Sequence, residues 1–266
     1  MSVVNILYNS YDLQTTADSA NTILTKDIIE KKLPEKIINL KQDTIRDGFS
    51  VIDVQYTNKI ITLSGWLISD TAANLRTLTD NFKNYLRPNE KNLDIETYGG
   101  SPAYRRYVCS CQSIDVPEEH WQTTQVPYAA EFLCNPFGKA TSVTTVNLNS
   151  GSNITSTPYN ESPSITGTYK CKPTITITVV SETDLTAIKF ENTTNLDWIQ
   201  VARSFSAAEV LTINCESETV QVDGSNVDFT GVFPRFDPGT SVLSTTTTDS
   251  GAFAITISFT YYPTYL

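Results

Sequence analysis

The sequence predicts a mainly β protein with one amphipathic helix, organised as an α+β domain followed by a β-sandwich. Three observations lead to this prediction. The chain has 266 residues, which exceeds the size that one hydrophobic core usually serves. Long helical periodicity occurs in one stretch, in the first half of the chain. Short alternating runs separated by turn residues fill the second half at the spacing typical of a sandwich.

One helix is expected at about residues 70–87. Apolar residues recur there at spacings of three and four, at Leu75, Leu78, Phe82 and Leu86. Ser69 and Asp70 are suitable N-cap residues, and Pro88 ends the pattern. Alternating residues on either side predict strands at 59–67, 93–97, 104–114 and 128–134. A sheet with the helix across it would bury the apolar face of each.

Residues 27–46 allow two interpretations. Ile28, Ile29 and Leu33 cluster before Pro34, which fits a short helix. In residues 31–46, charged residues alternate with aliphatic ones, which fits a strand that leaves the domain. The sequence leaves both interpretations open.

The composition changes after Pro136-Phe137-Gly138, because residues 139–168 are rich in Ser, Thr, Asn and Gly. We therefore expect one domain at 1–138 and a second at 139–266. Strands of the second domain are predicted at 174–180, 185–190, 197–201, 209–214, 219–222 and 253–261. Thr-rich strands such as 174–178 place aliphatic side chains on one face and hydroxyls on the other, as in an antiparallel sheet with one solvated face.

The most informative segment is residues 223–239. Asp223-Gly224 predicts a tight hairpin turn, because Gly adopts a positive φ without steric cost. Pro234 and Pro238 cannot donate backbone hydrogen bonds, so they confine the segment to an edge or a connection. The aromatic residues that follow the turn predict a buried aromatic corner of a sandwich: Phe229, Phe233 and Phe236.

This segment resembles the second domain of the distal tail proteins of phages with long non-contractile tails. The residues that carry the resemblance are Asp223, Gly224, Gly231, Phe233, Pro234, Pro238 and Gly239. The first half of the chain resembles the ring-forming domain of the same family at Asp47, Gly48, Gly65, Pro136 and Phe137. These residues occur in the family's order, around the predicted helix and strands. The Cys109-x-Cys111 pair departs from the family pattern.

The resemblance implies a structural virion protein at the tail tip, assembled in the host cytoplasm. Family members form a six-membered ring between tail tube and tip, with the first domains as a belt around the DNA channel and galectin-like second domains pointing outward. The implied partners are further copies of the chain, the tail tube protein, a tail-associated hub or tip protein and a receptor-binding protein. A closed ring needs two different complementary patches per subunit. Residues 31–46 or 47–56 are candidates for one patch, through β-augmentation.

Charge and hydropathy exclude several partners. The chain has 19 Lys plus Arg against 29 Asp plus Glu, a formal net charge of -10, so it does not attract phosphate or an anionic membrane. A ring wall of this charge would let DNA pass without specific binding. No apolar run reaches the roughly 20 residues of a transmembrane helix, so no membrane insertion is expected.

The sequence predicts neither an enzyme nor a cofactor or metal site. His120 is the only histidine, and no nucleophile elbow or phosphate-binding loop accompanies it. The adjacent Glu118 and Glu119 would point to opposite sides of an extended chain, so they cannot flank one bond. The five cysteines show no metal-binding spacing and fit free, reduced thiols: Cys109, Cys111, Cys134, Cys171 and Cys215.

The alternative function is a carbohydrate-binding or host-receptor-binding module of the tail tip. An exposed aromatic on a β-sandwich can stack on a sugar ring, and Trp198 is the candidate, against the simpler interpretation that it is core or half-buried. A third class, a tail-tube or fibre subunit, would form open polymers in place of closed rings.

Overall fold

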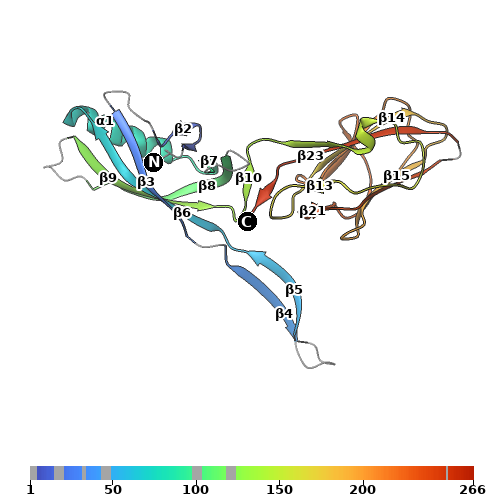
Figure 1. Cartoon of the computed structure of the whole chain (residues 1–266), viewed down its shortest axis with the longest axis horizontal. Coiled ribbons are helices and arrows are strands. Elements are labelled where there is room, and N and C mark those ends of the chain that lie inside the picture. Colours follow the sequence, from blue (N-terminus) through green and yellow to red (C-terminus); the bar gives the residue numbers. More distant parts are fainter. Residues whose placement is uncertain are drawn as a thin grey trace. The chain divides into compact units, whose positions relative to one another are not determined.

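A computed structural model describes residues 5–14, 21–31, 34–42, 49–97, 104–117, 124–249 and 251–266. Its contacts divide the chain into two compact units, residues 1–141 with Leu266 and residues 142–265. These units are called the first and the second domain below, and Figure 1 shows the elements of each.

The first domain is built on an antiparallel sheet with the strand order β2-β1-β7-β8-β9-β6-β3. These strands are β1 (Ile6–Tyr8), β2 (Tyr11–Asp12), β3 (Asn21–Lys31), β6 (Lys59–Ser69), β7 (Lys91–Glu96), β8 (Tyr104–Asp115) and β9 (Gln125–Cys134). The short β10 (Gly138–Ala140) pairs with β8. Burial alternates strictly along β6, so one face of the sheet is covered and the other is open.

Helix α1 (Ala72–Leu86) covers one face of this sheet, with Leu75, Leu78, Thr79, Phe82 and Leu86 buried. Its N-cap is Thr71, whose hydroxyl accepts the backbone N–H of Asn74 at 3.2 Å, so the prediction of Ser69 or Asp70 as the cap is wrong. Asp70 accepts a hydrogen bond from the side-chain amide of Asn74 at 2.8 Å instead. The predicted amphipathic helix is confirmed.

The chain between β3 and β6 forms a hairpin. Its strands, β4 (Lys36–Gln42) and β5 (Phe49–Tyr56), pair with each other, and in Figure 1 they continue the course of β3 and β6. The Thr57 N–H donates to the Glu35 carbonyl at 3.0 Å, and the Tyr56 ring packs edge-on against Phe137 at 5.2 Å, which fixes the base of the hairpin. Residues 21–31 are extended, so the interpretation of a short helix beginning at Asp27 is wrong.

The second domain is a β-sandwich of two antiparallel sheets. One sheet has the order β11-β23-β14-β17-β18-β19 and the other β12-β22-β15-β16-β20. The first contains β11 (Thr144–Asn147), β14 (Thr174–Ser181), β17 (Val210–Asn214), β18 (Thr219–Val222), β19 (Ser225–Asn226) and β23 (Ala254–Tyr261). The second contains β12 (Tyr159–Glu161), β15 (Ala187–Asn192), β16 (Asp197–Ala202), β20 (Thr230–Gly231) and β22 (Leu243–Thr248).

The two sheets share one apolar core, to which Ile177 of β14 and Phe190 of β15 both belong. Smaller elements complete the domain: the 3-10 turn η1 (Leu148–Gly151), the strand pair β13 (Ser164–Ile165) and β21 (Gly239–Thr240), and β24 (Thr264–Tyr265). The predicted fold class, mainly β with a single α-helix, is confirmed.

Two of the five cysteines are joined, which corrects the prediction of free thiols. Cys109 on β8 and Cys134 on β9 lie directly opposite each other, with 4.1 Å between their Cα atoms, and form a disulfide. Cys111, Cys171 and Cys215 are free. The two partners lie 25 residues apart in sequence, so only the register of β8 against β9 brings them together.

Candidate functional site

The Asp223-Gly224 turn joins β18 to β19 as the sequence predicts. Both residues have positive φ, 48° at Asp223 and 78° at Gly224, and Val222 pairs with Ser225 across the turn. The Asp223 carboxylate also accepts the backbone N–H of Val210 at 3.0 Å. The turn is therefore tied to the neighbouring strand β17.

Gly231 lies where the chain passes closest to β16. Its φ is +113°, and a Cβ atom there would overlap the carbonyl oxygen of Trp198. The next residue, Val232, donates its N–H to that same carbonyl at 2.7 Å. Only glycine permits this approach without displacing the chain from Trp198.

The rest of the segment anchors itself in the core through Phe236. That ring is fully buried and packs edge-on against Phe259 at 4.9 Å. The carbonyl of Arg235 accepts hydrogen bonds from the side chains of Asn192, at 2.7 Å, and Asn195, at 2.8 Å. These contacts satisfy the fully buried Asn192 and hold the loop on the sandwich.

The interpretation of this segment as a buried aromatic corner is right only in part. Phe236 and Pro234 are buried and Phe233 is half-buried. Phe229 remains 38% exposed and Val232 61% exposed. Pro238 and Gly239 lie on the surface, where Gly239 has a φ of +98° and an open surrounding.

The motif residues of the first domain lie at strand contacts. A Cβ atom at Gly65 would overlap the carbonyl oxygen of Leu24, so glycine lets β6 approach β3 closely. Phe137 supports Tyr56 at the base of the β4–β5 hairpin, and Pro136 precedes it on the way to β10. Asp47 and Gly48 lie outside the described residues. The motif residues thus support backbone geometry and do not converge on one reactive centre.

Among the described residues, β3 forms one edge of the sheet of the first domain. This strand of 11 residues pairs with β6 on one side, and it ends the strand order of the sheet. At the bulge between Thr25 and Asp27, the N–H of Thr25 is taken by the side chain of Gln14 at 2.8 Å. Ile29, beyond the bulge, is 50% exposed. The edge after the bulge is available for pairing with another chain.

The β4–β5 hairpin extends this surface with exposed aliphatic side chains. Ile37 is 48%, Ile38 51% and Val54 41% exposed. Two exposed isoleucines in sequence on a hairpin are typical of a surface that another protein covers. These residues fall within the candidate segments 31–46 and 47–56.

The family comparison concerns the second domain. Residues 166–262 match the family described as the siphovirus-type tail component, C-terminal domain. The matched range lies within the second domain, so that domain is similar to the tail component domain of siphoviruses. The resemblance to distal tail proteins that the motifs predict is confirmed, and all of the second-domain motif residues lie inside the matched range.

Comparison with solved structures covers the whole chain. The Dit protein of phage SPP1, described as a paradigm of the hub adsorption apparatus in phages that infect Gram-positive bacteria, covers 100% of both chains with a TM-score of 0.68 and 13% identity. At that identity the likeness shows the fold. A chain of the phage P2 baseplate aligns over 97% of this chain and 98% of its own at 9% identity, with a TM-score of 0.41. No curated protein matches the chain.

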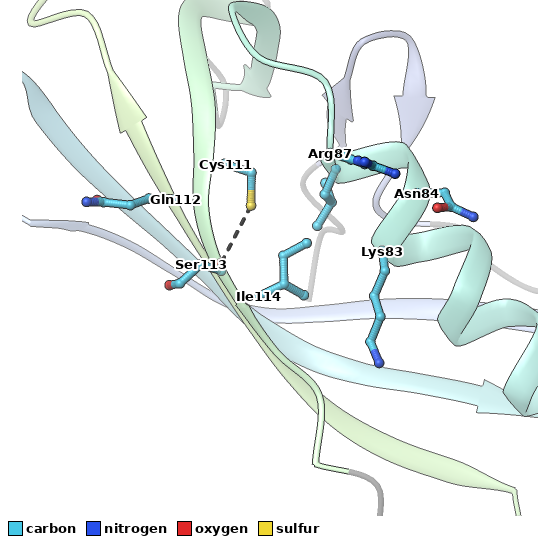
Figure 2. A pocket seen from close by; sticks show the side chains of 8 residues that line it. Lys83, Asn84, Arg87, Cys111, Gln112, Ser113 and Ile114 are labelled. Atoms are coloured by element: carbon cyan, nitrogen blue, oxygen red, sulfur yellow. Dashed lines mark hydrogen bonds between the residues drawn. The ribbon is translucent and has the colours of Figure 1, made fainter.

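One hollow of the first domain lies between α1 and β8 (Figure 2). It has a volume of about 340 Å³ and is lined by Lys83, Asn84, Leu86, Arg87, Cys111, Gln112, Ser113 and Ile114. Burial raises the pKa of the Cys111 thiol to about 11, so it is protonated at neutral pH. The lining holds no carboxylate or imidazole that could act as a general base. The hollow therefore offers no nucleophilic chemistry.

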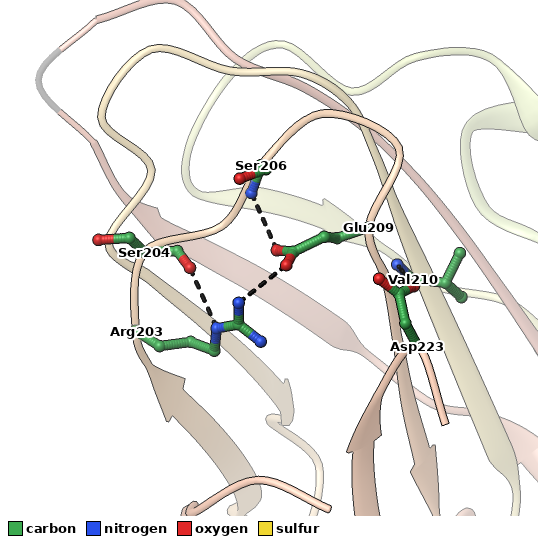
Figure 3. A network of polar contacts seen from close by, with 6 residues as sticks. All are labelled: Arg203, Ser204, Ser206, Glu209, Val210 and Asp223. Atoms are coloured by element: carbon green, nitrogen blue, oxygen red, sulfur yellow. Dashed lines mark hydrogen bonds and ion pairs between the residues drawn. The ribbon is translucent and has the colours of Figure 1, made fainter. Parts of the chain in front are cut away.

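A polar network in the loop between β16 and β17 is equally structural. Arg203 and Glu209 face each other at 2.8 Å, and Glu209 also accepts the backbone N–H of Ser206 at 2.9 Å (Figure 3). Arg203 in turn donates to the carbonyl of Ser204 at 3.0 Å. Both charges are used to hold the loop closed upon itself.

Metal-binding and catalytic groups can be placed only among the described residues. Among them, no group of three or more His, Cys, Asp or Glu side chains could hold a metal ion. His120, Glu118 and Glu119 lie outside the described residues. Among the described helices, none combines the length and apolar character needed to cross a membrane.

Sequence reasoning missed the open edge of β3. The signal in the sequence was the pair Ile28-Ile29 after Asp27, which could equally belong to a helix. Trp198 is half-buried on β16, in agreement with the simpler interpretation, and its stacking on a sugar stays a prediction.

Proposed function

We propose that this chain is a structural virion protein that forms a ring of six copies at the distal end of a siphophage tail tube. The ring surrounds the DNA channel and serves as the hub for tail-tip and receptor-binding proteins. Three observations support the proposal: the match of residues 166–262 to the tail component family, the fold shared with SPP1 Dit, and the edge of β3 after its bulge, which pairs with no other described strand. The edge of β3 is the main support for assembly, because it is a property of this chain's own geometry.

An open edge of this length is unusual for a protein that functions alone. Natural sheets protect their edges with short strands, prolines or inward charges, because exposed N–H and C=O groups pair with other chains. The opposite edge of the same sheet, β2, has two residues, whereas five residues of β3, 27–31, follow the bulge. A neighbouring copy that added a strand to β3 would use a different patch on its own surface, as a closed ring requires.

The proposed partners follow from the position in the tail. The first domains would form the belt that contacts the tail tube protein on one side and the tail-associated hub protein on the other. The net charge of -10 fits a channel wall that does not bind DNA. The proposed location is the tail tip of the virion, with assembly in the host cytoplasm, and the proposed role involves no catalysis.

The test is the mass and shape of the purified full-length protein. Six copies of 29.5 kDa give about 177 kDa, which light scattering after size exclusion distinguishes from a monomer. Negative-stain images should show closed rings with a central hole. Open filaments would favour a tube or fibre subunit. A monomer at all concentrations and in the presence of the tail tube protein would overturn the proposal.

A matched pair of variants tests whether the interface between copies includes β3. Ile29→Lys puts a charge on the open part of β3, and Val180→Lys puts the same charge at a 45% exposed position on β14 of the second domain. Both changes are on the surface, so each should alter the stability of the subunit by less than about 0.5 kcal/mol. We expect Ile29→Lys to shift the mass toward 29.5 kDa and Val180→Lys to leave it unchanged. Equal masses for both variants would move the contact away from β3.

A further inference from the structure

The outer face of the second sheet of the sandwich carries one indole among polar side chains. Residues that lie opposite each other on antiparallel strands point to the same face. Trp198 on β16 lies opposite Glu191 on β15, which lies opposite Ser244 on β22. In the neighbouring row, Gln200 lies opposite Lys189. This set of five residues is called the Trp198 face.

The backbone of Trp198 is held in place by the motif segment. Val232 bonds to the Trp198 carbonyl at 2.7 Å, and the glycine at position 231 brings this segment against the indole. No described residue accepts a hydrogen bond from the indole N–H, although a tryptophan in a core usually finds such a partner. The position is therefore both anchored and half-open, as a binding platform requires.

The charges of the Trp198 face cancel. The ammonium of Lys189 lies 2.6 Å from a carboxylate oxygen of Glu191 and over one face of the Trp198 ring, 5.1 Å from its centre, so a ligand would stack on the part of the indole that Lys189 leaves uncovered. Both side chains remain partly accessible, at 31% and 22%. In a chain with a net charge of -10, this face presents a balanced pair of one donor group and one acceptor group. A neutral ligand matches it better than an anion or a cation.

We propose that the Trp198 face binds a neutral saccharide. A pyranose ring has an apolar face of C–H groups, whose partial positive charge suits the negative face of an indole. Its hydroxyls both donate and accept, so they can bond to the Lys189 ammonium, the Glu191 carboxylate and the Gln200 amide. Two strand spacings of about 4.8 Å separate Trp198 from Ser244, which is room for about two sugar rings.

Other classes of ligand fit this face less well. Protein interfaces concentrate several aromatic residues, Met and Arg at their centre, whereas the Trp198 face has one aromatic residue and no Met or Arg. Nucleic acid needs an excess of positive charge, which the pairing of Lys189 with Glu191 removes. The face lies within one domain of one chain, so the inference stands or falls independently of ring assembly.

The test uses saturation-transfer NMR on the full-length protein, with lactose, maltotriose and triacetylchitotriose as neutral probes. Sialyllactose serves as the matched anionic probe for lactose. We expect transfer to at least one neutral sugar and, if lactose binds, weaker transfer to sialyllactose. Absence of transfer to all three neutral sugars would overturn the proposal, as would preferential transfer to sialyllactose.

Two variants locate the site. Trp198→Leu keeps apolar volume beside Gly231 and removes the π face, so affinity for the bound sugar should fall about tenfold or more. Tyr262→Leu removes another exposed aromatic of the same domain and should leave affinity unchanged. Gln200→Ala, a surface change, provides a second measure if Trp198→Leu does not fold, and should weaken binding severalfold. Unchanged affinity in both Trp198→Leu and Gln200→Ala, or in Gln200→Ala where it alone folds, would refute the assignment.

Discussion

Gly231→Ala should destabilise the second domain more than the conformational preference of alanine alone would. Residue 231 has a φ of +113°, where an alanine costs on the order of 1–2 kcal/mol. The added Cβ would also overlap the Trp198 carbonyl, so the segment must move and lose the bond from the Val232 N–H, worth about 1 kcal/mol. The total is roughly 2.5 kcal/mol, or about 10 °C in the melting temperature of a domain of this size.

Gly239→Ala is the matched control. Its φ of +98° imposes a similar conformational cost, but a Cβ atom there meets nothing within 4 Å. We expect a loss of about 1.5 kcal/mol and a shift of about 6 °C. Calorimetry of the full-length variants measures both values. Equal shifts for the two variants would show that the approach to Trp198 contributes nothing beyond backbone conformation, and the reasoning would be refuted.

Two further predictions concern the first domain. Arg106→Gln should cost about 2 kcal/mol, because Arg106 makes two bonds of 2.8 Å to the nearly buried Asp94. Lys172→Gln, which removes an exposed pair with Glu218 at 3.7 Å in the second domain, should cost less than about 0.5 kcal/mol, and urea unfolding of both variants checks the contrast. Burial raises the pKa of Cys111 to about 11, so its alkylation by iodoacetamide should accelerate about tenfold per pH unit between pH 7.5 and 9.5. A rate that levels off near pH 9 would contradict the burial of this thiol.

The sequence predicted those parts of the fold that depend on near neighbours. The helix pattern from Leu75 to Leu86 and the alternation along β6 are complete within the element itself, so periodicity was sufficient. The Asp223-Gly224 turn is similarly local, since a two-residue turn needs only residues that tolerate positive φ.

The sequence did not predict strands whose buried side chains are not the hydrophobic ones. Strand β22 buries Thr245 and Thr247 in the inward positions, so its alternation is invisible in a run of threonines. Strand β3 contains a bulge between Thr25 and Asp27, which interrupts the period of two and makes the following residues resemble a short helix. In both cases the long-range partner strand, and not the local sequence, determines which side chains face inward.

The candidate sites also differ in whether they depend on a short segment or on distant residues. The sequence alone identified the tail component motif and the residues that need glycine or proline, because those requirements lie in the backbone of a short segment. Only the tertiary structure placed β3 at an open edge, joined Cys109 to Cys134 and surrounded Trp198 with Lys189, Glu191 and Gln200. Strand order and register are set by pairing between distant residues, and these pairings decide which side chains share a face and which backbone groups remain free.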